Sequence, residues 1–202
     1  GMRRVERPED LRAALEAAMR EAASAFGDDR MFIEQAVVRP RHIEVQILAD
    51  ELGETIHLFE RDCSLQRRHQ KVIEIAPAQN LDPAVREAIL ADAVAFARGV
   101  GYVNAGTVEF LLDTAGPRAG QHVFIEMNPR IQVEHTVTEE VTGIDLIKKQ
   151  IQIASGEKLG LEQKQIRVAG KHAIECRIGA EDPSRNFAPS PGEIKLYFPP
   201  GG

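Results

Sequence analysis

The chain has 202 residues, of which 43% are hydrophobic and 28% charged, and its formal net charge at pH 7 is −6. This composition is typical of a folded globular protein, and the negative charge argues against a nucleic-acid or membrane partner. We recognise no signal peptide and no long apolar run, so we expect a cytoplasmic protein in which Cys63 and Cys176 are buried free thiols rather than a disulfide.

The first predicted elements are a helix and two strands. Apolar side chains recur at three- and four-residue steps over residues 9–26, which predicts an amphipathic helix that ends at Gly27. Residues 31–37 and 42–48 then alternate between apolar and polar side chains, and this period of two predicts β-strands.

A hairpin and a second helix follow. Residues 49–53 form a turn-like stretch, and residues 55–59 predict the strand that completes a hairpin with the strand before the turn. Residues 61–70 are too charged and unpatterned for a strand, so they predict a loop. The pair Asp82-Pro83 is typical of a helix start, because it offers a capping side chain and a residue that needs no hydrogen-bond acceptor.

The rest of the chain predicts a second hairpin, a third helix and later strands. Residues 107–113 and 122–127 are apolar strands joined by the Gly/Pro-rich connection 114–120, which is expected to hold no helix. The last predicted elements are a helix at 145–154 and strands at 172–178 and 193–198. This mixed order predicts an α+β fold with an antiparallel sheet rather than a parallel doubly wound fold.

The second hairpin is predicted to bring two carboxylates together. Opposite residues in an antiparallel pair have a constant sum of positions, so a loop centred near Pro117 pairs Glu109 with Glu126. Paired acids destabilise a sheet unless a cation neutralises them, and such oxygen ligands suit Mg²⁺ beside phosphates. Asn128 is predicted to share their face. The alternative is that one glutamate points to solvent or that the loop is asymmetric.

Basic residues concentrate in one segment of this acidic chain. They are Arg61, Arg67, Arg68, His69 and Lys71. One interpretation is a site for an anionic ligand, and the other is a solvated charged face. The cluster alone does not distinguish a nucleotide, a carboxylate or a protein as the partner.

A row of polar side chains follows the metal candidates. Extended geometry would place four residues on one face: Asn128, Arg130, Gln132 and Glu134. Such a face is either a solvent-exposed edge strand or a line that runs from a metal site through an anion site to a general base.

Four long motifs punctuate the chain. They are His42-Ile-Glu-Val-Gln-Ile-Leu-Ala, Glu60-Arg-Asp-Cys-Ser-Leu-Gln-Arg-Arg-His-Gln-Lys71, Ala105-Gly-Thr-Val-Glu-Phe110 and Glu126-Met-Asn-Pro-Arg-Ile-Gln-Val-Glu-His135. Together they closely resemble the biotin carboxylase family of ATP-grasp enzymes. The resemblance continues through Glu175-Cys-Arg-Ile and Pro189-Ser-Pro-Gly-Glu, so it covers essentially the whole chain. Motifs of this length arise by chance far less often than a single Gly-rich hexamer.

The resemblance implies an ATP-grasp fold, with an antiparallel sheet and flanking helices, that is truncated at both ends. Residues 1–156 would be the ATP-grasp core without most of its glycine-rich phosphate loop, and residues 157–202 would start the carboxy-terminal subdomain. The family's amino-terminal Rossmann-like region, the lysine before its lid and a further arginine near the biotin would lie outside the chain. We therefore expect the isolated chain to fold, to bind nucleotide weakly and to be inactive alone.

The resemblance also implies the roles of individual residues. The ligands of Mg²⁺ or Mn²⁺ are Glu109, Glu126 and Asn128. The residues that contact ATP are Glu34, Val37, His42, Gln66, His69 and Leu111. The bicarbonate pocket and catalytic group comprise Lys71, Arg130, Gln132, Val133 and the general base Glu134. A carboxylate such as Glu134 can act as a base near neutral pH if burial raises its pKa.

The implied reaction is the carboxylation of biotin with MgATP and bicarbonate. Bicarbonate attacks the γ-phosphate to give carboxyphosphate, whose breakdown delivers CO₂ to the ureido nitrogen of biotin. The implied partners are a biotin carboxyl carrier domain or protein, a carboxyltransferase and, in the parent protein, further copies of the same chain. The carboxyltransferase selects pyruvate or an acyl-CoA as acceptor, and motifs similar to both subfamilies occur here.

Two functions of other kinds stay open. A carbamoyl-phosphate synthetase-like ATP-grasp ligase would share the two metal glutamates, but the spacing of Lys71, Arg130 and Glu134 argues against it. A non-catalytic ATP-grasp interaction module would keep the fold and lose the chemistry, and the intact site residues argue against that.

Overall fold

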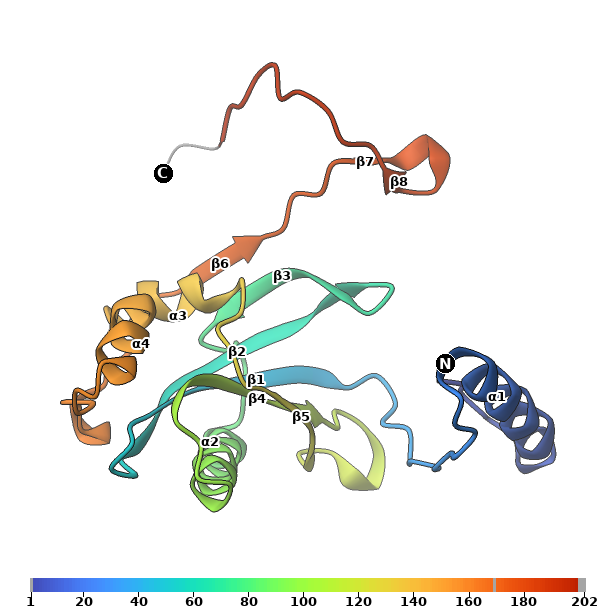
Figure 1. Ribbon diagram of the computed structural model, residues 1–202, viewed down its shortest axis with the longest axis horizontal. Helices are drawn as coiled ribbons and strands as arrows, with labels where there is room; N and C mark the ends of the chain where they lie inside the picture. The colour runs from blue at the N-terminus through green and yellow to red at the C-terminus, as the bar shows by residue number, and fades with distance from the viewer. Residues whose placement is uncertain (1, 169, 200–202) are drawn as a thin grey trace. The chain divides into compact units, whose positions relative to one another are not determined.

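The main element of the structure is an antiparallel sheet. The structure is a computed structural model that describes residues 2–168 and 170–199. Within these residues the sheet has six strands in the order β5-β4-β1-β2-β3-β6 (Figure 1). The strands are β1 (Arg41–Ala49), β2 (Thr55–Arg67), β3 (Gln70–Ala76), β4 (Asn104–Leu112), β5 (His122–Asn128) and β6 (Ala173–Cys176). Every neighbouring pair is antiparallel, which confirms the predicted α+β class.

Helices cover both faces of this sheet. They are α2 (Pro83–Gly99) on one face and α3 (His135–Thr142) and α4 (Leu146–Ala154) on the other (Figure 1). Smaller elements are the 3₁₀ turns η2 (Gly116–Arg118), η3 (Gln163–Gln165) and η4 (Pro183–Arg185) and the short pair β7 (Glu181–Asp182) and β8 (Ala188–Pro189). The site described below lies on the face that carries α3.

The chain divides into two compact units, residues 1–38 and 39–202. The first unit holds η1 (Pro8–Asp10) and α1 (Leu11–Phe26), which confirms the predicted amphipathic helix. Gly27 ends α1 in a left-handed conformation, with its N–H donating to the Ala23 carbonyl. The domain boundary expected at residue 156 stays a prediction.

Strand β1 lies in the middle of the sheet and is buried on both faces. Ile43, Val45 and Ile47 are fully buried and pack in one cluster with α2 residues such as Ile89 and Ala93. On the opposite face, Leu48 packs near α4. The next positions of that face are Glu44 and Gln46, which are just as buried. The face of β1 under α2 is therefore apolar, whereas the opposite face carries buried polar side chains beside the apolar cluster that α3 forms with Ala76.

Side-chain caps begin two helices where the sequence predicts them. Asp82 accepts hydrogen bonds from the Ala84 and Val85 backbone at the start of α2, and Pro83 follows it. Asp145 caps α4 in the same way through Lys148. Both predicted helices are confirmed to within one residue at their starts.

The loop predicted at residues 61–70 is wrong. Strand β2 runs through to Arg67, a two-residue turn with positive φ at Arg68 and His69 follows, and β3 begins at Gln70. The charges do not prevent a strand because they are paired: Arg61 lies directly opposite Glu44 on β1. The length of β2 and the whole of β3 were therefore not predicted from the sequence.

Other differences concern segments without a partner strand. Residues 31–37 and 193–198 are not strands, and large side chains there are exposed, such as Phe32 and Leu196. Alternation alone does not make a strand, because backbone groups need a neighbouring strand to pair with. The connection 114–120 does hold one turn of 3₁₀ helix, η2, and α3 was not predicted at all.

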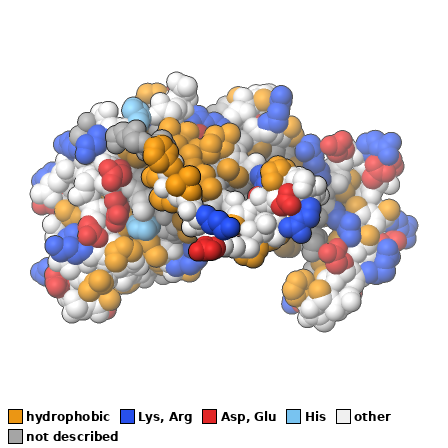
Figure 2. Space-filling model, turned by 90° about the horizontal axis from the view of Figure 1, so that it is seen from above, with side chains coloured by type: hydrophobic (Ala, Val, Ile, Leu, Met, Phe, Trp, Pro, Cys, Tyr) orange, Lys and Arg blue, Asp and Glu red, His pale blue; other side chains and the backbone are white. Residues whose placement is uncertain are grey.

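Hydrophobic side chains also gather on parts of the surface (Figure 2). Exposed apolar side chains include Phe124 and Ile125 on β5 and Ile151 on α4. Among the described residues, no helix is both long and apolar enough to cross a membrane. Both cysteines are free thiols as expected, but only Cys63 is buried and Cys176 is exposed.

Candidate functional site

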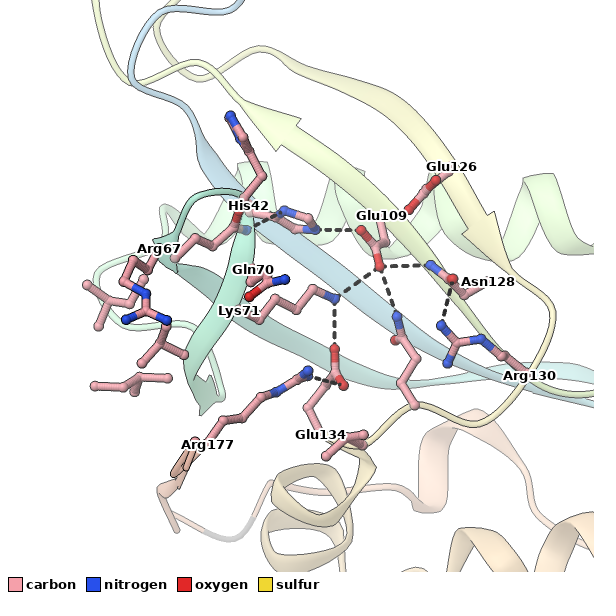
Figure 3. A pocket seen from close by; sticks show the side chains of 18 of the residues that line it. His42, Arg67, Gln70, Lys71, Glu109, Glu126, Asn128, Arg130, Glu134 and Arg177 are labelled. Atoms are coloured by element: carbon pink, nitrogen blue, oxygen red, sulfur yellow. Dashed lines mark hydrogen bonds and ion pairs between the residues drawn. The ribbon is translucent and has the colours of Figure 1, made fainter. Parts of the chain in front are cut away.

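A polar pocket of about 860 Å³ opens on the α3 face of the sheet (Figure 3). Eleven of the fourteen predicted site residues line it: His42, Gln66, His69, Lys71, Glu109, Glu126, Asn128, Arg130, Gln132, Val133 and Glu134. They come from β1, β2, β3, β4, β5 and the segment that enters α3. The structure thus brings residues from four separate motifs to one place.

A row of charged residues crosses four strands beneath the pocket. Glu126 on β5 lies opposite Glu109 on β4, which lies opposite Glu44 on β1, which lies opposite Arg61 on β2. The predicted pairing of Glu109 with Glu126 is therefore confirmed. It holds because the β-bulge of this hairpin lies beyond Glu109, on the side toward the loop.

Glu109 collects hydrogen-bond donors from three sides. Its Oε1 accepts from Lys71 Nζ at 3.0 Å, Asn128 Nδ2 at 2.8 Å and Gln132 Nε2 at 2.9 Å. Its Oε2 lies 2.7 Å from His42 Nε2. Burial opposes ionisation, but the contacts with His42, Lys71 and Gln132 lower the pKa of Glu109 to about 2. Glu109 is therefore a carboxylate under all ordinary conditions.

Lys71 is the central cation of the pocket. Its ammonium contacts Glu44 Oε2, Glu109 Oε1 and Glu134 Oε1, the last at 2.7 Å. Figure 3 shows the contacts with Glu109 and Glu134. Burial disfavours the charged ammonium, yet the neighbouring carboxylates raise the pKa of Lys71 above its ordinary value. Lys71 is thus held as a cation that faces the pocket and can bind an anion.

Glu134 lies at the point where the polar segment turns into α3. Strand β5 ends at Asn128, so the extended geometry predicted for residues 130–134 is wrong, although these residues reach the same pocket. Glu134 Oε1 accepts from Lys71 and Oε2 accepts from Arg177 Nη2 at 2.7 Å. Burial acts to raise the pKa of Glu134, but Lys71 and Arg61 hold it below its ordinary value, which corrects the expected direction.

The remaining anion-site candidates differ in exposure. Gln132 is buried and directs its amide nitrogen to Glu109. Arg130 and Val133 are exposed at the pocket lining. The Arg130 guanidinium makes only weak local contacts, to the Ile131 carbonyl at 3.1 Å and to Asn128 Oδ1 at 3.4 Å. It is therefore free to turn toward a ligand.

Only some of the residues predicted to contact ATP lie at the pocket. His42 and Gln66 are joined, since Gln66 Nε2 donates to His42 Nδ1 at 3.0 Å, which leaves the His42 Nε2 hydrogen to point at Glu109. Leu111 is half-buried on β4 and does not line the pocket. Glu34 and Val37 belong to the first unit, so their roles stay predictions from the resemblance.

A divalent cation fits the oxygen-rich wall of the pocket. Glu109, Glu126 and Asn128 offer two carboxylates and an amide oxygen, which are ligands that Mg²⁺ and Mn²⁺ prefer. Glu126 is exposed in the pocket and makes no hydrogen bond or ion pair with the described residues. Glu126 therefore offers a carboxylate that a cation in the pocket could bind.

Several residues in or directly beneath the pocket were not predicted as site residues, among them Glu44, Arg177 and Glu181. Glu44 and Arg177 contact Lys71 and Glu134 directly, and Glu181 lines the pocket from β7. Glu44 could have been found, because it lies in the same motif as His42 and shares its face. Arg177 lies in the quoted motif Glu175-Cys-Arg-Ile, but its strand pairs with β3, and β3 had not been predicted.

Comparison with known proteins gives a consistent result. Residues 1–162 match the family described as carbamoyl-phosphate synthase L chain, ATP binding domain. The whole chain is 55% identical to a pyruvate carboxylase of Aspergillus terreus, of which it covers 17%. It is also 55% identical, over its whole length, to a biotin carboxylase of a Nostoc species, of which it covers 44%.

Solved structures agree with the sequence matches. The biotin carboxylase domain dimer of Hydrogenobacter thermophilus 2-oxoglutarate carboxylase, in complex with MgADP, ADP and bicarbonate, matches with a TM-score of 0.84 and 50% identity. The match covers 96% of this chain and 42% of that one. The chain therefore has the ATP-grasp architecture of biotin carboxylases, and it spans less than half the length of these relatives.

Proposed function

This chain belongs to the carbamoyl-phosphate synthase L chain ATP-binding family, and from that premise we propose that it forms the reaction centre of a biotin carboxylase. The parent protein would use MgATP and bicarbonate to carboxylate the biotin of a carrier. One observation carries the proposal: the Lys71 ammonium lies between Glu109 and Glu134 and contacts both. The proposed metal ligand Glu109, the proposed anion-binding Lys71 and the proposed base Glu134 are therefore direct neighbours.

Bicarbonate would bind against Lys71 and Arg130, two of the basic residues that line the pocket. Lys71 and Arg130 both present N–H groups there, and charge-assisted hydrogen bonds from such groups are short and strong. The Gln132 and Val133 backbone would complete the pocket. The likeness to a domain that was crystallised with bicarbonate supports this assignment.

ATP would place its phosphates against the wall formed by Glu109, Glu126 and Asn128. A divalent cation bound there supplies positive charge that offsets the phosphates during phosphoryl transfer. His42, Gln66 and His69 would contact the nucleotide. The related Hydrogenobacter domain was crystallised with MgADP, which supports this class of nucleotide.

Glu134 would take the proton of bicarbonate. It is ionised and within 2.7 Å of Lys71, so an anion bound to that ammonium lies within reach of its carboxylate. Arg177 holds the other oxygen of Glu134 and fixes its direction. A base with a lowered pKa accepts a proton weakly, and it becomes stronger if Lys71 turns from Glu134 to the bound anion.

The surroundings of the site are proposed from the same relatives. They include a biotin carboxyl carrier, a carboxyltransferase and a second copy of the chain, in keeping with the domain dimer named above. Residues 1–156 would be the ATP-grasp core, and residues 157–202 the start of the carboxy-terminal subdomain. The cytoplasmic location and the choice between pyruvate and an acyl-CoA stay proposals outside the reach of these residues.

The test is to supply the purified parent protein with MgATP, labelled bicarbonate and free biotin. We expect ADP formation that requires bicarbonate and transfer of the label to biotin. ADP formation that instead requires ammonia and yields carbamoyl phosphate would favour the related ligase. Binding of nucleotide without any turnover would favour a non-catalytic module.

A further inference from the structure

One buried guanidinium lies beneath the pocket without reaching its surface. Arg61 is fully buried on β2 and does not line the pocket. Its contacts are Glu44 Oε1 at 2.5 Å, Gln46 Oε1 at 2.9 Å, Thr138 Oγ1 at 2.9 Å, Thr107 Oγ1 at 3.2 Å and Gln132 Oε1 at 3.3 Å. All five N–H donors of the guanidinium are thus used, on four different segments of the chain.

Two of these contacts lead directly into the proposed reaction centre. Glu44 accepts from Arg61 with one oxygen and from Lys71 with the other. Gln132 accepts from Arg61 with its amide oxygen, and its amide nitrogen donates to Glu109 at 2.9 Å. Arg61 is therefore connected to Lys71 through Glu44 and to Glu109 through Gln132.

We propose that Arg61 is a positioning residue, which fixes the direction of the Gln132 amide and the place of Glu44 under Lys71. This inference rests on the proposed function for its kinetic consequences. Arg61 touches neither substrate nor metal in this scheme. It acts through the two residues that it holds.

The chemistry of the guanidinium makes the amide direction unambiguous. A guanidinium only donates, so the Gln132 oxygen must face Arg61 and its nitrogen must face Glu109. Lysine in place of Arg61 would keep the charge but lose the planar fork, which reaches Glu44 and Gln132 with separate nitrogens. Charge also matters here, because Arg61 shares the buried carboxylate of Glu44 with Lys71, and few other cations among the described residues neutralise the carboxylates of this buried site.

The test is a double-mutant cycle in the parent protein with Arg61→Lys, Gln132→Ala and both together. We expect each single change to raise the KM for bicarbonate about tenfold or more, with a smaller change in the KM for ATP. Because both changes remove the same oriented amide, the double variant should be no worse than the poorer single one. Effects that simply multiply would overturn the proposal.

A crystal structure of the Arg61→Lys parent gives a readout that does not depend on any reaction. We expect the Gln132 amide to have turned, so that its nitrogen no longer lies within the present 2.9 Å of Glu109. An unchanged hydrogen bond between Gln132 and Glu109 would overturn the proposal even if the parent proved to have another activity. A parent that showed no bicarbonate-dependent ADP formation would count against the proposed function alone.

A matched pair of smaller changes decides the question if Arg61→Lys does not fold. Thr107 and Thr138 are both buried hydroxyl acceptors of Arg61, but only Thr107 shares its nitrogen, Nη2, with Gln132. Thr107→Val should raise the KM for bicarbonate severalfold by letting that edge of the guanidinium move, and Thr138→Val should leave it unchanged. Equal effects of the two substitutions would reduce Arg61 to a purely structural role.

Discussion

The two faces of strand β1 are equally buried but are built in opposite ways. Toward α2 the strand presents Ile43, Val45 and Ile47, and toward the pocket it presents Glu44 and Gln46, all with no exposed surface. The first face is held by apolar packing with many replaceable partners. The second is held by a network of specific ion pairs and hydrogen bonds, in which Glu44 contacts both Arg61 and Lys71.

We infer that the apolar face of β1 mainly stabilises the fold and that the charged face mainly serves the proposed function. Burying an ion costs several kcal/mol, and buried pairs are often no more stable than apolar residues of the same shape. The row Glu109, Glu44 and Arg61 is thus a poor choice for stability alone. Its value lies in presenting Lys71 as a fixed cation beside two carboxylates.

The largest expected effect is on the charged side, at the unpaired carboxylate. Glu126→Gln leaves a divalent cation with too few protein oxygens beside the phosphates, so bicarbonate-dependent ATP hydrolysis by the parent should fall to background. The exposed α3 variant Glu140→Gln, far from the row of acids in sequence and outside the pocket lining, should behave as wild type. Near-normal hydrolysis by Glu126→Gln at ordinary Mg²⁺ would remove Glu126 from the metal site.

On the apolar side the expected effect is on stability. Ile47→Ala leaves a cavity in the fully packed face under α2 and should lower the free energy of unfolding by about 2–5 kcal/mol. The exposed α4 variant Ile151→Ala should stay within about 0.5 kcal/mol of wild type. Urea denaturation of the 202-residue chain expressed by itself measures both, and a small loss for Ile47→Ala would contradict the packing described here.

Acid should weaken the charged face. Glu109 has a pKa of about 2 in the folded chain against 4.5 for the free group, so its contribution is complete above pH 4.5 and is lost as pH falls toward 2. This contribution is on the order of 3 kcal/mol. Glu109→Gln should flatten the loss of stability between pH 4.5 and 2, as measured by urea denaturation at each pH. An equally steep loss in Glu109→Gln would show that other groups control the acid transition.

The sequence was informative where a local rule determined the outcome. The pairing of Glu109 with Glu126 followed from hairpin arithmetic, and the start of α2 followed from Asp82 and Pro83, because each depends on residues close in the chain. The long motifs then identified most of the pocket, since their spacing carries information that periodicity does not.

Local sequence patterns did not predict contacts between residues that are far apart in the chain. The charged half of β2 looked like a loop because its partner for Arg61 is Glu44, seventeen positions away on another strand. Residues 31–37 looked like a strand because their side chains alternate, and residues 193–198 were also predicted as a strand, but no neighbouring strand pairs with either segment in the described chain. Arg177 was missed because only the pairing of β3 with β6 brings it beside Glu134.

The most direct test of the central claim is Glu134→Gln in the parent protein, with kcat, MgATP affinity and melting temperature measured on one preparation. A general base typically contributes about 10²- to 10⁴-fold, so kcat for biotin carboxylation should fall by that factor while ATP affinity and melting temperature stay nearly unchanged. A stable Glu134→Gln variant that carboxylates biotin at the normal rate would contradict the claim that this charged face exists to activate bicarbonate.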